Sequence, residues 1–74
     1  MFTIKVIEQN TGKPLKDRRI CVFFDGMFRG HTKDLYTDKD GEANFDYDNG
    51  TGEVYVDGKK RYTGKIEGRK IIYI

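Results

Sequence analysis

One cysteine and one histidine are the side chains best suited to nucleophilic or general acid–base chemistry in this chain. Cys21 lies in an apolar stretch, and His31 follows a glycine further along the chain. A cysteine nucleophile needs a base close by, and a histidine metal site needs further histidine or cysteine ligands near it. The sequence shows neither arrangement. We therefore expect no catalytic residue, no bound metal and no cofactor, with His31 as a solvated loop residue.

Two acidic stretches carry oxygen-bearing side chains at alternate positions, one from Asp38 to Glu42 and one from Asp46 to Asn49. Calcium loops use such spacing. The full loop pattern also needs Gly at about its sixth position and Glu at about its twelfth, and neither stretch has them when counted from Asp38 or from Asp46. Because Asp before Gly is also what a tight turn prefers, we expect turns here, with calcium binding as the alternative.

Charge is strongly segregated along the chain behind a net charge of +2. Residues 1–33 carry seven Lys and Arg against three Asp and Glu, residues 34–57 carry one against eight, and residues 58–74 carry six against one. In an antiparallel sheet the acidic middle segment can lie beside the basic strands and pair with them, which is our expectation. The alternative is a basic surface for nucleic acid. It would consist of Lys59, Lys60, Arg61, Lys65, Arg69 and Lys70.

The elements that position these residues are short strands, because nine glycines divide the chain into segments too brief for most helices. Seven segments rich in Val, Ile, Phe, Tyr and Thr are bounded by Gly, Asp or Asn, as strands are. They span about residues 2–8, 19–24, 31–37, 42–47, 53–57, 61–66 and 69–74. The clearest alternation places Ala43, Phe45 and Tyr47 on one face, which we expect to face the core. We predict an all-β single domain over residues 1–74, a seven-stranded two-layer antiparallel β-sandwich, with a small β-barrel as the alternative.

The composition indicates which interactions can stabilise such a domain and in which cellular compartment we expect it. With one cysteine the chain forms no internal disulfide, so support beyond its small core would come from a metal or from oligomerisation. No apolar run reaches the roughly 18 residues of a membrane span, and the first residues alternate like a strand rather than a signal peptide. These features favour the cytoplasm. A module cut from a larger secreted or cell-surface protein would share them.

Two stretches of turn residues resemble a known group of modules. The first is Gly-Lys-Pro-Leu at residues 12–15, and the second is Thr-Asp-x-x-Gly at residues 37–41, before Phe45. Over about residues 4–57 the chain resembles the prealbumin-like β-sandwich modules: carboxypeptidase regulatory-like, transthyretin-like and Cna protein B-type. It departs from them at residues 16–19, and it lacks the Tyr-Arg-Gly-Ser tail of the hydroxyisourate hydrolase branch. The resemblance implies a non-catalytic role as a spacer, stalk unit, folding aid or adhesion element.

Several large apolar side chains fall outside the cleaner apolar faces of the strands, and the final strand has an unprotected edge. We predict a non-enzymatic binding or assembly module that contacts a protein partner, or a second copy in a homodimer through edge residues 70–74. The expected interface residues are Phe23, Tyr55, Ile71 and Tyr73, with Met27 and Phe28 as a loop contact. The alternative is a small β-barrel that binds nucleic acid through its basic C-terminal strands.

Overall fold

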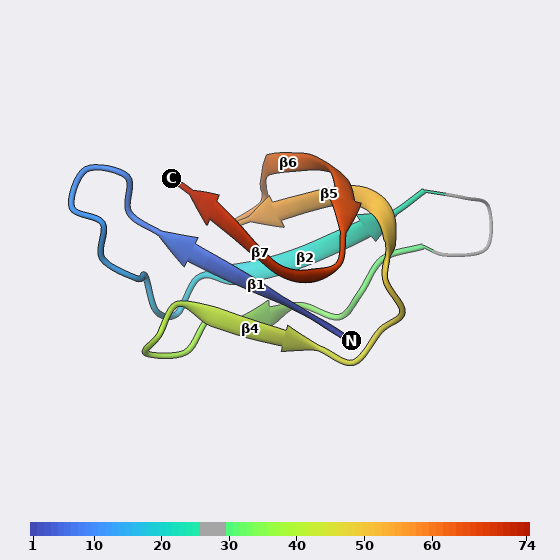
Figure 1. Cartoon of the computed structure of the whole chain (residues 1–74), viewed down its shortest axis with the longest axis horizontal. Helices are drawn as coiled ribbons and strands as arrows, with labels where there is room; N and C mark the ends of the chain where they lie inside the picture. The colour runs from blue at the N-terminus through green and yellow to red at the C-terminus, as the bar shows by residue number, and fades with distance from the viewer. Residues whose placement is uncertain (26–29) are drawn as a thin grey trace.

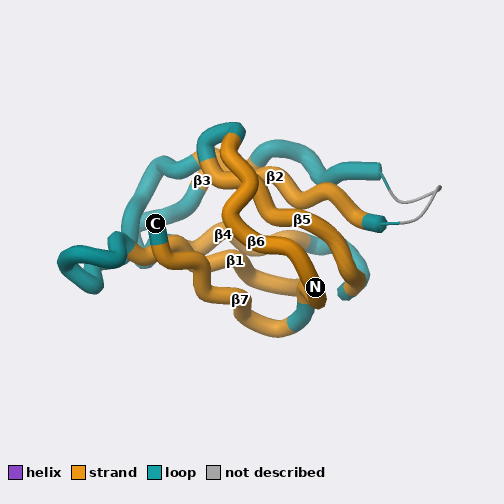
Figure 2. Tube along the Cα trace, turned by 90° about the horizontal axis from the view of Figure 1, so that it is seen from above, coloured by secondary structure: helices purple, strands orange, loops and turns teal. Residues whose placement is uncertain are grey.

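Seven strands in two sheets make up the fold in the computed structural model, which describes residues 1–25 and 30–74. In chain order they are β1 (Phe2–Ile7), β2 (Arg19–Phe24), β3 (Leu35–Tyr36), β4 (Glu42–Phe45), β5 (Gly50–Val56), β6 (Lys59–Ile66) and β7 (Gly68–Tyr73). The two sheets lie against each other as two layers (Figure 1 and Figure 2). The predicted all-β class and two-layer sandwich are therefore confirmed.

The strand orders are β4-β1-β7 in one sheet and β3-β2-β5-β6 in the other. Neighbouring strands pair antiparallel except β1 and β7, which run parallel from Phe2 opposite Gly68 to Ile7 opposite Tyr73. This pair departs from the purely antiparallel arrangement that we predicted. Its cause is the connection at Glu67: the chain leaves the four-stranded sheet there and enters the other sheet, so β7 meets the distant β1 instead of folding back on β6 (Figure 1).

The core lies between the layers because alternate residues of each long strand point inward. On β1 the buried residues are Phe2, Ile4 and Val6. Phe2 stacks on Phe45 with ring centroids 5.1 Å apart and meets Phe24 edge-on at 6.0 Å. The other buried hydrophobic residues are Ile20, Val22, Ala43, Val54, Val56, Ile66 and Ile72.

β5 begins earlier than the sequence pattern predicts. Residues 50–52, which we expected in a loop, pair with residues 64–66 of β6. On its other side, Gly52 permits β5 to approach β2 closely, since a Cβ atom at that position would overlap the carbonyl oxygen of Phe23 on β2. The glycine that looked like a loop residue is thus a strand residue where two backbones nearly touch.

β3 is shorter than the predicted segment 31–37, and β4 ends at Phe45. Before β3 the chain pairs with β2 through one isolated bridge and through Thr32, whose buried hydroxyl accepts the N–H of Val22 at 3.1 Å. Tyr47, expected on the core face, lies beyond the end of β4 and is 36% exposed. Side-chain hydrogen bonding replaces part of the expected ladder.

The two stretches of turn residues noted in the sequence meet at the end of β1. Val6 donates its N–H to the carbonyl oxygen of Gly41 at 2.8 Å and accepts the N–H of Leu15 at 3.0 Å. Gly41 has a left-handed backbone with φ of 75°, and a Cβ there would lie 2.6 Å from the oxygen of Val6 and 2.9 Å from Pro14. Only glycine fits this contact between the two turns.

Thr37 is buried, and its side chain holds the loop before β2 in place through two hydrogen bonds. Its hydroxyl donates to the carbonyl oxygen of Leu15 at 2.7 Å and accepts the N–H of Arg18 at 2.9 Å. Thr37→Val keeps the shape and leaves both backbone groups without a partner, so we expect the free energy of unfolding to fall by about 1–3 kcal/mol. Urea unfolding followed by circular dichroism measures this. Thr63→Val, at an exposed position of β6, is the matched control, and equal midpoints for the two variants would contradict the assignment.

The predicted pairing of the acidic segment with its basic flanks is confirmed. Each ion pair among the described residues joins a carboxylate of residues 34–57 to a cation outside them. The pairs are Lys5 with Glu42 at 3.8 Å, Arg69 with Glu42 at 3.7 Å, Lys60 with Glu53 at 3.2 Å and Arg18 with Asp57 at 3.1 Å. Glu42 links all three strands of its sheet, β4, β1 and β7. Because these side chains remain partly exposed, each pair contributes about 1 kcal/mol or less.

Asp57 makes stability depend on pH. Its pKa is lowered, first by the hydrogen bond from the backbone N–H of Arg19 and then by the guanidinium of Arg18. The folded-state pKa lies below the unfolded one, so this contribution is present above the unfolded pKa and is lost as the pH falls through the folded value. Asp57→Asn removes the titration and suits the positive φ of 53°. We expect its urea midpoint to fall less between neutral and acidic pH than that of the wild type; parallel curves would refute this.

Candidate functional site

The residues predicted for an interface lie on two opposite faces of the sandwich. Phe23 on β2 and Tyr55 on β5 point out of the four-stranded sheet, with ring centroids 5.1 Å apart. Ile71 and Tyr73 on β7 point out of the three-stranded sheet. The structure therefore brings them together as two pairs, each on its own surface. The predicted loop contacts, Met27 and Phe28, lie outside the described residues.

β7 is an edge strand, with β1 on one side and no paired strand on the other among the described residues. Just beyond it, Ile74 donates its N–H to the carbonyl oxygen of Ile7 at 3.0 Å and accepts the N–H of Gln9 at 2.8 Å. Backbone groups alternate in direction along a strand. Those of Ile71 and Tyr73 therefore face the open edge, where an extended segment can pair with them.

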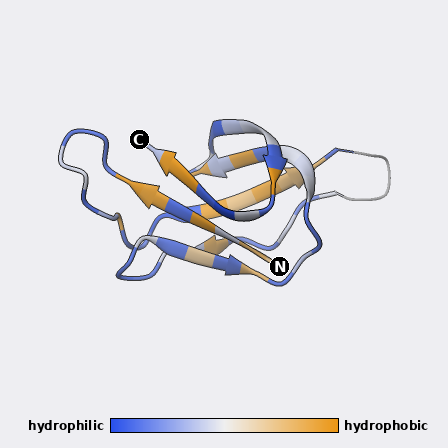
Figure 3. Cartoon of the chain, viewed as in Figure 1, coloured by the Kyte–Doolittle hydropathy of each residue, from blue (hydrophilic) through white to orange (hydrophobic). Residues whose placement is uncertain are grey.

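The first half of β7 carries a side chain that opposes pairing with another chain, and the second half does not. Half-buried Lys70 shares the inward side of β7 with buried Ile72 and places its Nζ 4.4 Å from the ring centroid of Tyr62. Charged side chains that point inward on an edge strand oppose pairing with another chain. Further along, Ile71 is 40% exposed and Tyr73 is 58% exposed. Figure 3 shows the apolar end of β7 beside the apolar end of β1.

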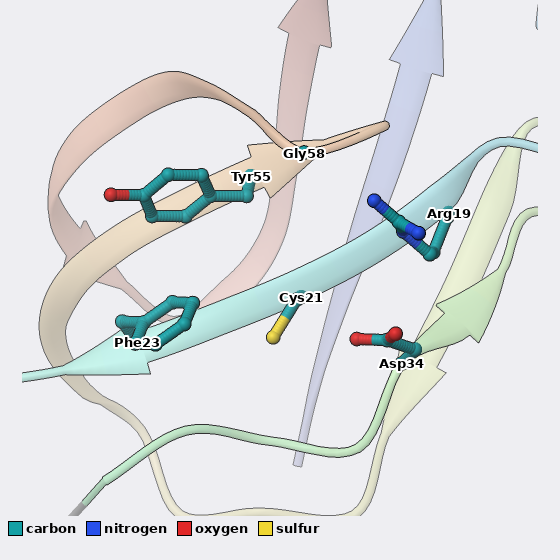
Figure 4. A pocket seen from close by; sticks show the side chains of 6 residues that line it. All are labelled: Arg19, Cys21, Phe23, Asp34, Tyr55 and Gly58. Atoms are coloured by element: carbon teal, nitrogen blue, oxygen red, sulfur yellow. The ribbon is translucent and has the colours of Figure 1, made fainter.

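A hollow of about 430 Å³ lies on the outer face of the four-stranded sheet (Figure 4). Its lining residues are Arg19, Cys21, Phe23, Asp34, Tyr55 and Gly58, and we call it the Arg19 hollow. The two rings stand at one end, Arg19 and Asp34 at the other, and Cys21 between them. Sequence reasoning missed both charged residues. Period-two alternation on β2 could have found Arg19 through Phe23, whereas the weakly patterned segment before β3 gave no signal for Asp34.

Cys21 and His31 are close, but their geometry does not support a nucleophile and its base. The Sγ of Cys21 lies 4.0 Å from Nδ1 of His31. The same Nδ1 lies 2.9 Å from the carbonyl oxygen of Thr32, a contact for which it has to carry the proton, so it cannot accept one from the thiol. Burial raises the pKa of Cys21, and the neighbouring carboxylate of Asp34 raises it further. The thiol therefore stays neutral near pH 7.

This raised pKa predicts slow alkylation of Cys21. We expect iodoacetamide to modify Cys21 more slowly than free cysteine at pH 8, because less thiolate is present. Asp34→Asn removes one cause of the shift and should speed the reaction a few-fold. Asp46→Asn, at an exposed carboxylate elsewhere, should leave it unchanged. Mass spectrometry of quenched time points measures the rate, and a wild-type rate equal to that of free cysteine would contradict this prediction.

The acidic stretch that begins at Asp38 forms the expected turn. Oδ1 of Asp38 accepts the N–H of Asp40 at 2.9 Å and that of Glu42 at 3.0 Å. The carboxylate of Glu42 is engaged by Lys5 and Arg69. Over residues 1–25 and 30–74, no group of three or more His, Cys, Asp or Glu side chains is placed to hold a metal ion.

The basic C-terminal residues are partly engaged within the fold. Lys60 pairs with β5, and Lys70 covers the ring of Tyr62. The hydroxyl of Tyr62 donates to the carbonyl oxygen of Lys65 at 2.8 Å. Single-stranded nucleic acid needs free rings among the cations on which bases can stack. Tyr62 is therefore not a free stacking platform at this position.

The described strands define the class of the protein as a small β-sandwich of three- and four-stranded sheets. No family model, curated protein or solved structure matches the chain. The described residues also contain no helix that is long and apolar enough to cross a membrane. Two surfaces of the described residues remain as candidate sites, the β7 edge and the Arg19 hollow.

Proposed function

We propose that the domain is a non-enzymatic binding or assembly module that adds an extended protein segment to the β7 edge at residues 71–74. In the simplest case the added segment is β7 of a second copy. The observation that carries the proposal is the open edge of β7, where the backbone groups of Ile71 and Tyr73 face outward beside their exposed side chains. The non-catalytic roles implied by the resemblance to prealbumin-like modules agree with it.

Strand addition would use two kinds of contact at this edge. Backbone hydrogen bonds to the outward-facing N–H and carbonyl groups supply affinity, and side chains on the sheet face supply specificity. Ile71 and Tyr73 are already partly covered, so their further burial contributes about 1–2 kcal/mol each. Lys70, which lies against Tyr62, limits the available edge to a few residues. The association is therefore expected to be reversible and to depend on concentration.

Light scattering after size-exclusion chromatography, over a wide range of protein concentration, tests the proposal. We expect the mass of the wild type to rise toward that of a dimer. Tyr73→Ser removes the ring from both copies but keeps the N–H, and should weaken association at least tenfold. Tyr73→Pro also removes the N–H that faces the open edge, without breaking a bond to β1, and should abolish association. Tyr36→Ser, at a residue that is 62% exposed on the other sheet, is the control.

Two outcomes would count against the proposal. A wild type that is strictly monomeric at high concentration, with Tyr73→Ser unchanged, would remove self-association. If Tyr73→Ser and Tyr73→Pro weakened association equally, the contact would involve the side chain alone and not strand addition. Hydrogen exchange gives an independent readout, because pairing should protect the amides of Ile71 and Tyr73 and leave Ile74, which is bonded within the sheet, unchanged.

A further inference from the structure

We infer that the Arg19 hollow binds a small zwitterion with an apolar side chain, of the class of a free α-amino acid. The ammonium group would face Asp34, the carboxylate would face Arg19, and the side chain would pack on Phe23 and Tyr55. This site lies on the opposite face of the sandwich from the β7 edge. It goes beyond the proposed function and does not depend on it.

The charged end of the hollow carries one group of each sign. Arg19 and Asp34 both project toward it in Figure 4. Within residues 1–25 and 30–74 neither side chain takes part in an ion pair, although four other pairs form elsewhere on the surface. A ligand that carries both an ammonium and a carboxylate can satisfy both groups at once, and a guanidinium can bind a carboxylate with two parallel hydrogen bonds.

The turn after β5 leaves room for the guanidinium of Arg19. A Cβ atom at Gly58 would lie 3.1 Å from a terminal nitrogen of Arg19, so the glycine lets this side chain rest across the turn. The backbone N–H of Arg19 donates to Asp57 at 3.1 Å, which fixes the start of β2 at this place. The guanidinium thus lies at the rim of the hollow and forms no ion pair with any residue of 1–25 or 30–74.

The aromatic end is a preformed apolar wall. Phe23 is 42% exposed although its ring contacts both Tyr55, at 5.1 Å, and His31, at 5.0 Å. The hydroxyl of Tyr55 donates to Glu53 at 3.3 Å, which orients this ring. The neutral thiol of Cys21 lies between the two ends and adds no charge of its own. An apolar side chain would cover the exposed part of Phe23.

Size and charge select against other ligand classes. A hollow of about 430 Å³ is near the lower end of ligand pockets, which suits a single small molecule. A ligand with only a positive charge would be repelled by Arg19, and one with only a negative charge would be repelled by Asp34. Either ligand would leave Arg19 or Asp34 without an opposite charge, so a zwitterion fits the hollow best.

Titration with L-phenylalanine, followed by amide chemical shifts of the labelled full chain, tests this inference. We expect saturable shifts at Cys21, Phe23 and Tyr55, and few at β7. Phenethylamine has the ring and ammonium only, 3-phenylpropanoate has the ring and carboxylate only, and glycine has both charges without a ring. Each should bind about tenfold more weakly than L-phenylalanine. These three analogues test the two charges and the ring separately.

Matched variants locate the site. Arg19→Gln and Asp34→Asn should each weaken binding about tenfold. Arg18→Gln and Asp46→Asn remove one charge of the same sign outside the hollow and should bind as the wild type does. The inference is overturned if L-phenylalanine gives no saturable shift up to about 50 mM. It is also overturned if the singly charged analogues bind equally well, or if binding survives in both hollow variants.

Discussion

Gly52→Ala is expected to lower the free energy of unfolding so far that the domain is largely or completely unfolded. The added methyl group would overlap the carbonyl oxygen of Phe23 and lie 2.9 Å from the Cα atom of Phe24. Gly52 cannot move away from these atoms freely, because β5 pairs with β2 on one side and with β6 on the other. A domain of this length has a total stability of about 4–11 kcal/mol, so a backbone clash in the central ladder is enough to unfold it.

Gly12→Ala is the matched control for Gly52→Ala. Unlike Gly52, Gly12 has a positive φ, 73°, but a Cβ there would meet no atom within 4 Å. It should cost only about 1 kcal/mol, through backbone strain alone. Far-UV circular dichroism and urea unfolding measure both variants. If the urea midpoint of Gly52→Ala lay at or above that of Gly12→Ala, β2 and β5 would not approach each other as closely at Gly52 as described.

Phe45→Ala has the second-largest expected effect. Phe45 is fully buried and stacks on Phe2 with an interplanar angle of 13°. Its loss leaves a cavity between the layers and should lower the free energy of unfolding by about 3–5 kcal/mol.

Phe23→Ala is the matched control for Phe45→Ala. The same side chain is removed from an outer face where Phe23 is 42% exposed, so the cost should be near 1 kcal/mol. Tyrosine fluorescence in urea follows both variants, since the chain has no tryptophan. Similar losses of unfolding free energy for Phe45→Ala and Phe23→Ala would contradict the assignment of Phe45 to the core and of Phe23 to the outer face.

Local patterns predicted much of the fold because strands, turns and charge pairing act over short ranges of sequence. The alternation of Ala43 and Phe45 correctly placed both in the core. The acidic segment did lie beside basic strands, since its carboxylates find cations on their neighbours. The turn before β4 formed around Asp38 and Gly41, as their residue types predict.

Long-range features were not visible in the same way. The parallel pairing of β1 with β7 depends on where the chain crosses between layers, which no local pattern records. Gly52 looked like a loop residue because glycine serves both turns and close backbone contacts. The Arg19 hollow joins β2, β5 and the segment before β3, so its two charged residues become neighbours only in the folded chain.

The parallel pairing of β1 and β7 also determines how the domain would carry a mechanical load. Phe2 lies opposite Gly68 and Ile7 lies opposite Tyr73, so the start of β1 and the end of β7 are at opposite ends of the paired region. Tension applied through these two ends pulls the strands past each other along their length. Their hydrogen bonds, which run across the strands, would then share the force instead of opening one after another.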